Sequence, residues 1–299
     1  MDLRALRYFI ETVRQNSFTL AAERLHVTQS TVSKMIRQLE SEVGQPLLLR
    51  EGRQLRLTDA GQVVFEKGQQ AVAMVREISL ALDDLSSLQR GTLTVGLPPM
   101  LNLLFTPAVA TFRERYPGVV LRLQESGGQV IERQVADGEL EVGVTLLPAA
   151  PALGLACRSL GAHPIDVIGS REASWAGKAS VQLTDLRDEP LVLPSDDFSL
   201  TRQIRDAFRE EDGQLRIAAQ SSQWDFLVAM TAAGLGTTLL PRPLLARLHL
   251  DDRLISRPLV HPTINWHPAL IRHPERYLSR AAQAWLDLCQ EVLQPPRIR

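Results

Sequence analysis

The first 57 residues contain three short stretches with apolar side chains at helical spacing. The first stretch repeats every three or four positions at Leu3, Leu6, Phe9, Ile10 and Val13. A second helix is expected at about 19–25, followed by a tight break at 26–27. Thr28 is a good N-cap residue, so a third helix is predicted to start directly after it. This order of helices is typical of a helix-turn-helix unit that binds DNA.

The third helix has two chemically different faces. Val32, Ile36 and Leu39 lie at i, i+4 and i+7 and are expected to point inward. The opposite face carries hydroxyls and two cations, which suit the base edges and phosphates of a major groove. The predicted DNA contacts on and around this helix are Thr28, Gln29, Ser30, Thr31, Ser33, Lys34 and Arg37. From the residues alone, an ordinary solvated face is an equally good interpretation.

Two short apolar runs follow, at 46–50 and 55–58, and a charged turn containing glycine separates them. This pattern predicts a β-hairpin wing. Arg53 near the tip suits a minor groove, and Arg50 and Arg56 suit phosphates. The alternative is a hairpin that only packs against the helices.

A long helix is predicted over 58–90, with Thr58 as its N-cap and Asp59 in its first turn. Its apolar and small residues alternate at spacings of four and three, which is the pattern of a coiled-coil seam. The seam consists of Val64, Gly68, Ala71, Val75, Ile78, Leu82 and Leu85. We expect two chains to dimerise along it, with Gly68 and Ala71 allowing close approach. The alternative is a helix that lies on its own domain.

From residue 92 onward, β-rich runs alternate with helical stretches. Strands are predicted at 93–97, 119–125 and 142–146, with helices between them, which implies a parallel sheet with ligands beyond the carboxyl ends of its strands. The pattern restarts with strands at 165–168, 190–193, 217–219 and 237–240 and helices near 199–211 and 225–233. The chain is expected to cross back near 264–271 and to end in a helix at 279–293.

Charge is distributed unevenly along a chain whose net charge is only −1. Residues 1–57 carry nine basic and six acidic side chains, so this segment is about +3 and the rest about −4. A basic head fits a protein that contacts phosphates at one end. No leader peptide and no run of about 18 apolar residues is visible, so we expect a cytoplasmic protein without a membrane span.

The sequence contains no recognisable catalytic or metal-binding motif. His261, His267 and His273 do not have the spacing of a helical metal pair. The segment 234–236 has two glycines but lacks the dinucleotide fingerprint, and it is expected to be a helix end and a turn. Cys157 and Cys289 are interpreted as reduced thiols, although a redox switch remains an alternative. We expect no enzyme activity, no metal and no cofactor.

The segment AAERLHVTQSTVSKMIRQLESEVGQPLLLR, followed by a wing and by LTDAG at the start of a long helix, resembles the LysR-type transcriptional regulators. The resemblance implies an α/β protein with an all-α winged helix-turn-helix head, a long linker helix and a two-lobed regulatory domain like a periplasmic binding protein. The implied division is a head at 1–57, a linker helix at 58–90, lobe I at 92–162 plus 268–299, and lobe II at 163–267.

The same resemblance implies partners and a mode of action. Members of the family bind double-stranded promoter DNA as homotetramers built from dimers and bend it. A small-molecule effector in the cleft between the lobes alters the bend and the contacts with RNA polymerase. Relatives often have proline at position 30 and arginine at position 34, where this chain has Ser30 and Lys34. Lysine keeps the charge but loses bidentate guanine recognition, so the operator cannot be transferred from relatives.

The cleft loops are placed by resemblance at 98–101, 126–129, 194–199 and 223–226. The expected effector contacts are Pro99, Met100, Gly128, Gln129, Phe198, Ser199, Trp224 and Phe226. Many relatives hold an effector carboxylate with hydroxyls in the first two loops, where this chain has Pro98-Pro99-Met100 and Gly127-Gly128. The backbone amides of Met100, Gly128 and Gln129 can still bind an anion, whereas Asp196 and Asp197 disfavour a strongly anionic ligand or simply cap the loop. Trp224 is either a pocket wall or an aromatic packed between the lobes.

Two other classes of function compete with a ligand-responsive regulator. A solute-binding protein or small-molecule enzyme would use the two-lobed body and would not need residues 1–90. An adaptor would dimerise through 58–90 without sensing a ligand.

Overall fold

The computed structural model describes the chain except residues 52–53, 86–90, 197, 211–213, 247–249 and 294–299, and it describes only the backbone at 50, 51, 54 and 83–85. The chain folds into two compact units. The first comprises Met1–Leu85 with Asp137–Glu139, and the second comprises Ser86–Ala136 and Leu140–Arg299. No helix in the described part combines the length and the apolar character needed to cross a membrane.

Three capped helices form the head of the first unit. They are α1 (Leu3–Gln15), α2 (Phe18–Arg24) and α3 (Gln29–Val43). The side chains of Asp2, Ser17 and Thr28 each accept a hydrogen bond from a backbone N–H in the first turn of the helix that follows. The α3 residues predicted to face inward are buried, and they form one core with the apolar face of α1.

The predicted wing is a two-stranded antiparallel hairpin of β1 (Leu48–Glu51) and β2 (Gln54–Leu57). Side chains of the helices hold both of its strands. Glu40 on α3 accepts hydrogen bonds from the backbone of Leu47 and Leu48, and Asn16 accepts one from Leu55 N. These bonds fix the position of the wing relative to α3.

The helix α4 (Asp59–Leu85) starts against the wing. Thr58 Oγ1 accepts a hydrogen bond from Gly61 N and donates one to Pro46 O. A Cβ atom on Gly61 would overlap the backbone carbonyl of Leu47, so only glycine fits where the helix passes the wing. This close approach explains the glycine of the LTDAG segment.

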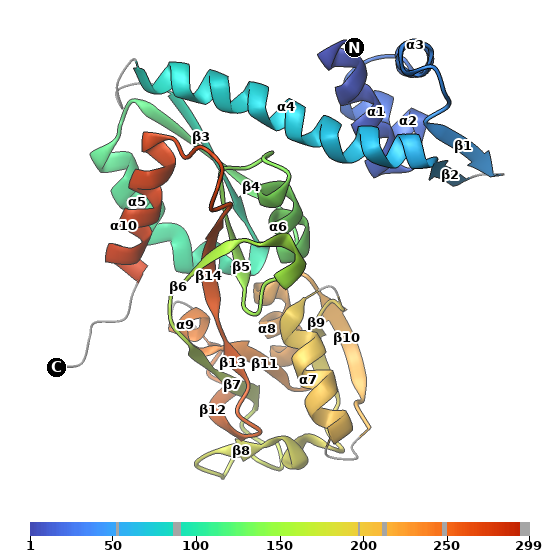
Figure 1. Ribbon diagram of the computed structural model, residues 1–299. Coiled ribbons are helices and arrows are strands. Elements are labelled where there is room, and N and C mark those ends of the chain that lie inside the picture. The colour runs from blue at the N-terminus through green and yellow to red at the C-terminus, as the bar shows by residue number, and fades with distance from the viewer. Residues whose placement is uncertain (52–53, 86–90, 197, 211–213, 247–249, 294–299) are drawn as a thin grey trace. The chain divides into compact units, whose positions relative to one another are not determined.

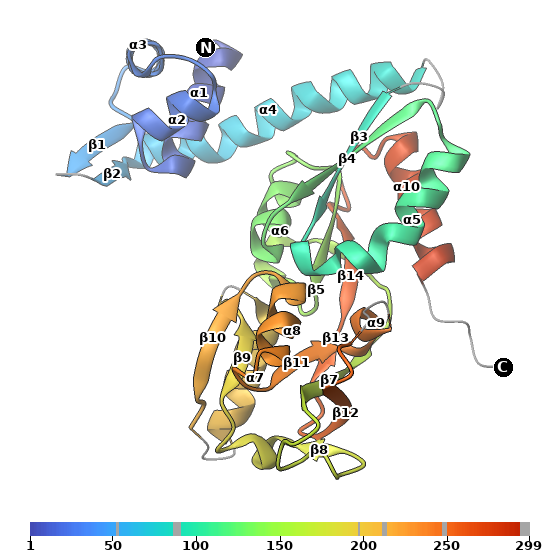
Figure 2. The ribbon, with the colours of Figure 1, turned by 180° about the vertical axis from the view of Figure 1, so that it is seen from behind.

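The second unit begins with a five-stranded sheet in the order β4-β3-β5-β14-β6 (Figure 1). Its strands are β3 (Gly91–Leu97), β4 (Val119–Glu125), β5 (Val142–Leu146), β6 (Ala156–Ser159) and β14 (Pro268–Arg272). The predicted β3, β4 and β5 are parallel, and β14 runs antiparallel to β5 and β6. The helices α5 (Asn102–Arg115) and α10 (Arg280–Leu293) lie together on one face, and α6 (Gly128–Ala136) covers the other (Figure 2).

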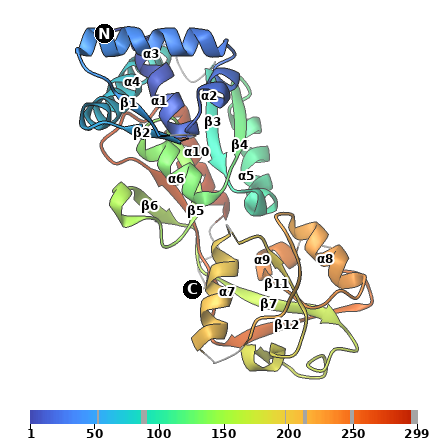
Figure 3. The ribbon, with the colours of Figure 1, turned by 90° about the vertical axis from the view of Figure 1, so that its right-hand side faces the viewer.

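The second lobe is built on strands that run through the middle of the chain. One sheet has the order β11-β7-β12-β8, with β13 also paired to β7, and β9 and β10 form a parallel pair. The strands are β7 (His163–Ser170), β8 (Val181–Gln182), β9 (Leu191–Pro194), β10 (Ile217–Ser221), β11 (Thr238–Pro241), β12 (Leu254–His261) and β13 (Asn265–Trp266). Its helices are α7 (Ser199–Glu210), α8 (Trp224–Ala232) and α9 (Arg242–Leu245) (Figure 3).

The chain passes between the lobes twice, where β7 starts and where β14 returns. Short 3₁₀ helices lie at η1 (Pro99–Leu101), η2 (Pro151–Leu153) and η3 (Leu183–Leu186). The observed fold confirms the predicted α/β class with a helical winged head, a long linker helix and a two-lobed body.

Candidate functional site

The exposed face of α3 is a preorganised surface of donors. Thr28 Oγ1 accepts a hydrogen bond from Thr31 N at 3.3 Å and lies 2.9 Å from Ser30 Oγ, which orders the first turn. Gln29, Ser30, Thr31, Lys34 and Arg37 are exposed, and Ser33 is half-buried. All seven predicted contact residues on and around this helix therefore lie between positions 28 and 37 and are exposed or half-buried.

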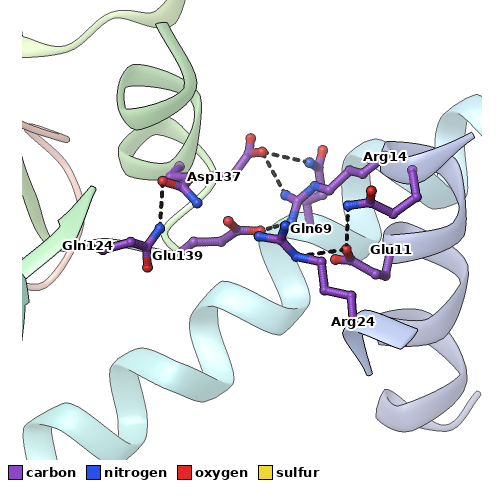
Figure 4. Close-up of polar contacts among 9 residues, drawn as sticks. Glu11, Arg14, Arg24, Gln69, Gln124, Asp137 and Glu139 are labelled. Carbon is purple, nitrogen blue, oxygen red and sulfur yellow. Dashed lines mark hydrogen bonds and ion pairs between the residues drawn. The ribbon is translucent and has the colours of Figure 1, made fainter. Parts of the chain in front are cut away.

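The cations of the head are not equally available to a phosphate. Arg24 pairs with Glu11, with Nε 3.2 Å from a carboxylate oxygen, and Gln15 donates to the same carboxylate at 2.8 Å (Figure 4). Arg37 instead bonds only weakly to its own helix, with Nε 3.3 Å from Ser33 O. A guanidinium held this loosely can be redirected to a phosphate at small cost.

The wing arginines are less fully described. Arg50 lies on β1 opposite Leu55, but its side chain is outside the described part. Arg53 lies outside the described residues altogether. Arg56 on β2 is exposed.

The long helix α4 divides into two parts along the predicted seam. A Cβ atom on Gly68 would lie 3.2 Å from Leu6 Cδ2, and Val64 packs against the head core. Gly68 therefore serves packing within its own chain, and not the close approach of a partner backbone that the sequence predicted. The later apolar side chains that the structure describes are exposed in the single chain. Met74, Val75, Ile78 and Leu82 are exposed to between 42% and 61%.

A cavity of about 600 Å³ lies between the two lobes of the second unit. One face of α6 lines it through Gly128, Gln129, Glu132 and Arg133, and one face of α7 lines it through Ser199, Arg202, Gln203 and Asp206. The end of β5 and the loop after it supply the rest, from Thr145 to Leu153. Pro98 and Phe198 also reach the lining.

A buried polar pair lies at this cavity. Thr145 Oγ1 donates to Glu132 Oε1 at 2.5 Å, and Ala150 N donates to Glu132 Oε2 at 3.0 Å. The Glu132 side chain is buried, with 4% of the residue exposed. Gly128 lies directly beside this pair, because a Cβ atom there would be 2.9 Å from Thr145 Oγ1. A larger residue at position 128 would displace the threonine.

Half of the predicted effector contacts line this cavity. Gly128, Gln129, Phe198 and Ser199 do so, and the Ser199 hydroxyl is buried without a hydrogen-bond partner among the described residues. Pro99, Met100, Trp224 and Phe226 are not part of the lining.

The surroundings of three of these four residues explain why they lie elsewhere. Met100 is buried in an apolar cluster with Leu227 and other residues of lobe II, and Phe226 is 53% exposed. Trp224 Nε1 donates to Asn102 Oδ1 at 3.3 Å, so this indole connects α8 with α5. This hydrogen bond favours the interpretation of Trp224 as an aromatic residue packed between the lobes over its interpretation as a pocket wall.

The loop acids also have defined surroundings. Asp196 accepts hydrogen bonds from Gln220 at 2.8 Å and from Arg205 at 2.6 Å, and these donors lower the pKa of its carboxyl. Its charge is therefore offset within lobe II. Asp197 lies outside the described residues.

Sequence reasoning missed the residues that give the cavity its chemistry, namely Thr145, Glu132, Arg133 and Arg202. The available signal was that ligands bind beyond the carboxyl ends of parallel strands, since Thr145 lies near the end of β5.

The described residues contain no group of three or more His, Cys, Asp or Glu side chains that would hold a metal ion. Both cysteines are free thiols. Burial raises the pKa of Cys289, and it raises that of the more exposed Cys157 together with the charge of Glu132.

Comparison with known proteins identifies the family. Residues 3–62 match the family described as bacterial regulatory helix-turn-helix protein, lysR family, and residues 86–294 match the LysR substrate binding domain. The chain is 37% identical over 298 residues to the uncharacterized HTH-type transcriptional regulator YwbI of Bacillus subtilis (strain 168), covering 99% of this chain and 98% of that protein. The chain belongs to the LysR-type transcriptional regulators. It therefore has a DNA-binding helix-turn-helix domain and an effector-binding domain, and its family consists of regulators and not of enzymes.

Further relatives of this LysR-type regulator agree with the assignment. It is 30% identical over 243 residues to the nitrogen assimilation regulatory protein nac of Klebsiella aerogenes, covering 81% of this chain and 78% of that protein. Full-length OxyR from Pseudomonas aeruginosa has the same fold, with a TM-score of 0.68 at 23% identity, covering 98% of this chain and 94% of that one. Full-length CbnR complexed with its target DNA matches with a TM-score of 0.62 at 20% identity, covering 98% of this chain and all of that one.

Proposed function

We propose that this LysR-type regulator reads promoter DNA with α3 and the wing, and that a small molecule in the inter-lobe cavity controls this binding. The observation that carries the first part is the ordered, donor-rich outer face of α3. The proposed DNA contacts are Thr28, Gln29, Ser30, Thr31, Ser33, Lys34, Arg37, Arg50 and Arg53.

Different residues of α3 are assigned different tasks. Ser33 and Ser30 are short hydroxyl donors and acceptors, which suit base edges in a major groove. Lys34 and Arg37 carry the charge that attracts phosphates, and phosphate contacts position the helix without reading sequence. Binding should therefore weaken steeply as the salt concentration rises.

We further propose that two chains pair through the later part of α4. Its exposed apolar side chains Val75, Ile78 and Leu82 recur at spacings of three and four, as a helical interface requires. Two DNA-binding heads on one dimer would contact two half-sites, and pairing of dimers would give a homotetramer.

The remaining proposals concern regulation and organisation. Effector binding would alter the relation of the two lobes, the bend in the promoter and the contact with RNA polymerase. The proposed domains remain 1–57, 58–90, 92–162 plus 268–299, and 163–267. A DNA-binding regulator of this family would act in the cytoplasm.

Gel-shift titration of the full chain on DNA upstream of its own gene tests the function. We expect binding that weakens from 50 to 200 mM salt by about 10³-fold if the dimer contacts at least six phosphates. Ser33→Ala should change the preference between operator variants more than the overall affinity. Absence of salt-sensitive binding to any upstream fragment would overturn the proposal. Operator binding that no small molecule changes would favour the adaptor alternative.

A further inference from the structure

We propose that the effector carries a protonated amine, which binds the buried carboxylate of Glu132, together with a carboxylate group at the arginine-lined part of the cavity. The effector class is thus an amino acid. This inference rests on the proposed function, because it assigns a ligand chemistry to the same inter-lobe cavity.

The first argument is the unpaired charge of Glu132. Glu132 is only 4% exposed, yet no Lys, Arg or His side chain among the described residues forms a salt bridge with its carboxylate. Buried carboxylates are normally paired with a cation or accept several hydrogen bonds. Glu132 accepts one bond from Thr145 and one from Ala150, which leaves about half of its acceptor capacity unused. A cationic ligand group in the cavity supplies the missing partner.

The second argument is that the side chains of Glu132 and Thr145 offer only acceptors to a ligand group that faces them. The hydroxyl hydrogen of Thr145 is committed to Glu132 at 2.5 Å, so its remaining lone pair can only accept. Gly128 adds no donor side chain, and a side chain there would collide with Thr145. A ligand group beside Glu132 and Thr145 must therefore donate hydrogen bonds, and an ammonium group has three donors.

The third argument is the charge balance of the whole lining. Arg133 and Arg202 come from helices on opposite sides of the cavity, and Glu132 and Asp206 offset their charges. A ligand without net charge keeps this balance, whereas a dianion would not. The unpartnered hydroxyl of Ser199 is one further donor for a ligand carboxylate. An ammonium at one end and a carboxylate at the other satisfy both parts of the lining.

The test is a thermal-shift screen of the full-length protein with the twenty L-amino acids and with their des-amino carboxylic acids. We expect at least one amino acid to raise the melting temperature by about 2 °C or more at saturation. In calorimetric titration, its des-amino counterpart should bind roughly 100-fold more weakly or worse, because the buried carboxylate then stays unpaired. If no amino acid binds, or if the des-amino acid binds equally well, the proposal is overturned.

A variant of Glu132 and a matched control outside the cavity sharpen the test. Glu132→Gln keeps the size of the side chain and removes its charge, so it should lose about 100-fold in affinity for the amine-bearing ligand. Glu172→Gln makes the same chemical change at an exposed position outside the cavity lining, and it is the matched control that should retain binding. Full binding by Glu132→Gln would contradict the proposal. Should Glu132→Gln fail to fold, the comparison of amino and des-amino ligands on the unmodified protein decides the matter alone.

The same samples separate this inference from the proposed function. Salt-sensitive operator binding is measured in gel shifts with and without each ligand. A des-amino acid or a sugar that alters operator binding would leave the effector function intact and refute the amine. If the protein binds no operator DNA either with or without ligand, the proposed function is refuted, whatever the thermal-shift screen shows.

Discussion

Replacing Leu82 by aspartate puts a charge into the proposed dimer seam. Leu82 is 61% exposed in the single chain, so the substitution should leave the fold of α4 intact. Full burial of a leucine side chain is worth about 1.5–3 kcal/mol, and the exposed fraction corresponds to about 1–2 kcal/mol per chain. Two chains lose about 2–4 kcal/mol, which weakens the dimer roughly 30- to 700-fold before the cost of desolvating aspartate is added.

Light scattering of the full-length protein in a dilution series, starting from a concentration at which the unmodified protein is fully assembled, measures this effect. The particle mass of Leu82→Asp should begin to fall at a concentration roughly 30- to 700-fold higher than that of the unmodified protein. Gln70→Asp is the matched control, because it adds the same charge at another exposed position of α4. Its direction around the helix axis differs from that of Leu82 by about a third of a turn. Circular dichroism should show equal helix content in all three proteins. An unchanged mass for Leu82→Asp would refute the assignment of the seam to this stripe.

Three further predictions address the head and the body. Arg37→Ala should weaken binding to all DNA sequences alike and reduce the slope of log affinity against log salt by about 1, and an unchanged slope in gel shifts would argue against a phosphate contact. Gly61→Ala should destabilise the head by about 1–3 kcal/mol because its Cβ overlaps a wing carbonyl. Gly177→Ala, which has no neighbour within 4 Å, should melt like the unmodified protein. Burial, and then the charge of His267, lower the pKa of His163, so the unfolded chain binds a proton more readily. Stability that depends on His163 should therefore fall as the pH drops below 6.5, and His163→Gln should show a smaller decrease in melting temperature from pH 7.5 to 5.5 than the unmodified protein. An equal decrease would count against this role.

The head was predictable because local rules determine most of it. Thr28 caps α3, and Val32, Ile36 and Leu39 mark its buried face by spacing alone. The role of Gly61 was not visible in the same way. Its need for glycine arises from the carbonyl of Leu47, which another element brings to it.

The apolar pattern of the long helix is continuous in the sequence, but its two ends have different surroundings in the fold. Val64 and Leu82 lie on one seam in the sequence, and both positions carry apolar side chains as a coiled coil requires. In the fold, Val64 packs against the head of its own chain, whereas Leu82 remains exposed. Periodicity identifies the face that will be buried, but it does not identify what will bury it.

The strands of lobe II were predicted incompletely for a related reason. The strand β12 carries Ser256, Arg257 and Pro258 at its centre, which interrupts the alternation of apolar residues. Its place comes from pairing with β7 over 254–258 and with β8 at its end. The two residues of β8 are too few to form a pattern at all.

The cavity shows most clearly why a site is harder to predict than a fold. Glu132 follows the buried Ile131 on a short amphipathic helix, where a glutamate normally faces solvent. It is buried because β5 places Thr145 and its hydroxyl against that turn, 13 positions later in the chain. In the sequence, Gly128 indicates only that a hydroxyl is absent at this position. In the fold, the hydroxyl of Thr145 lies directly beside Gly128. The chemistry of the cavity is therefore a property of two elements together, and neither loop alone reveals it in the sequence.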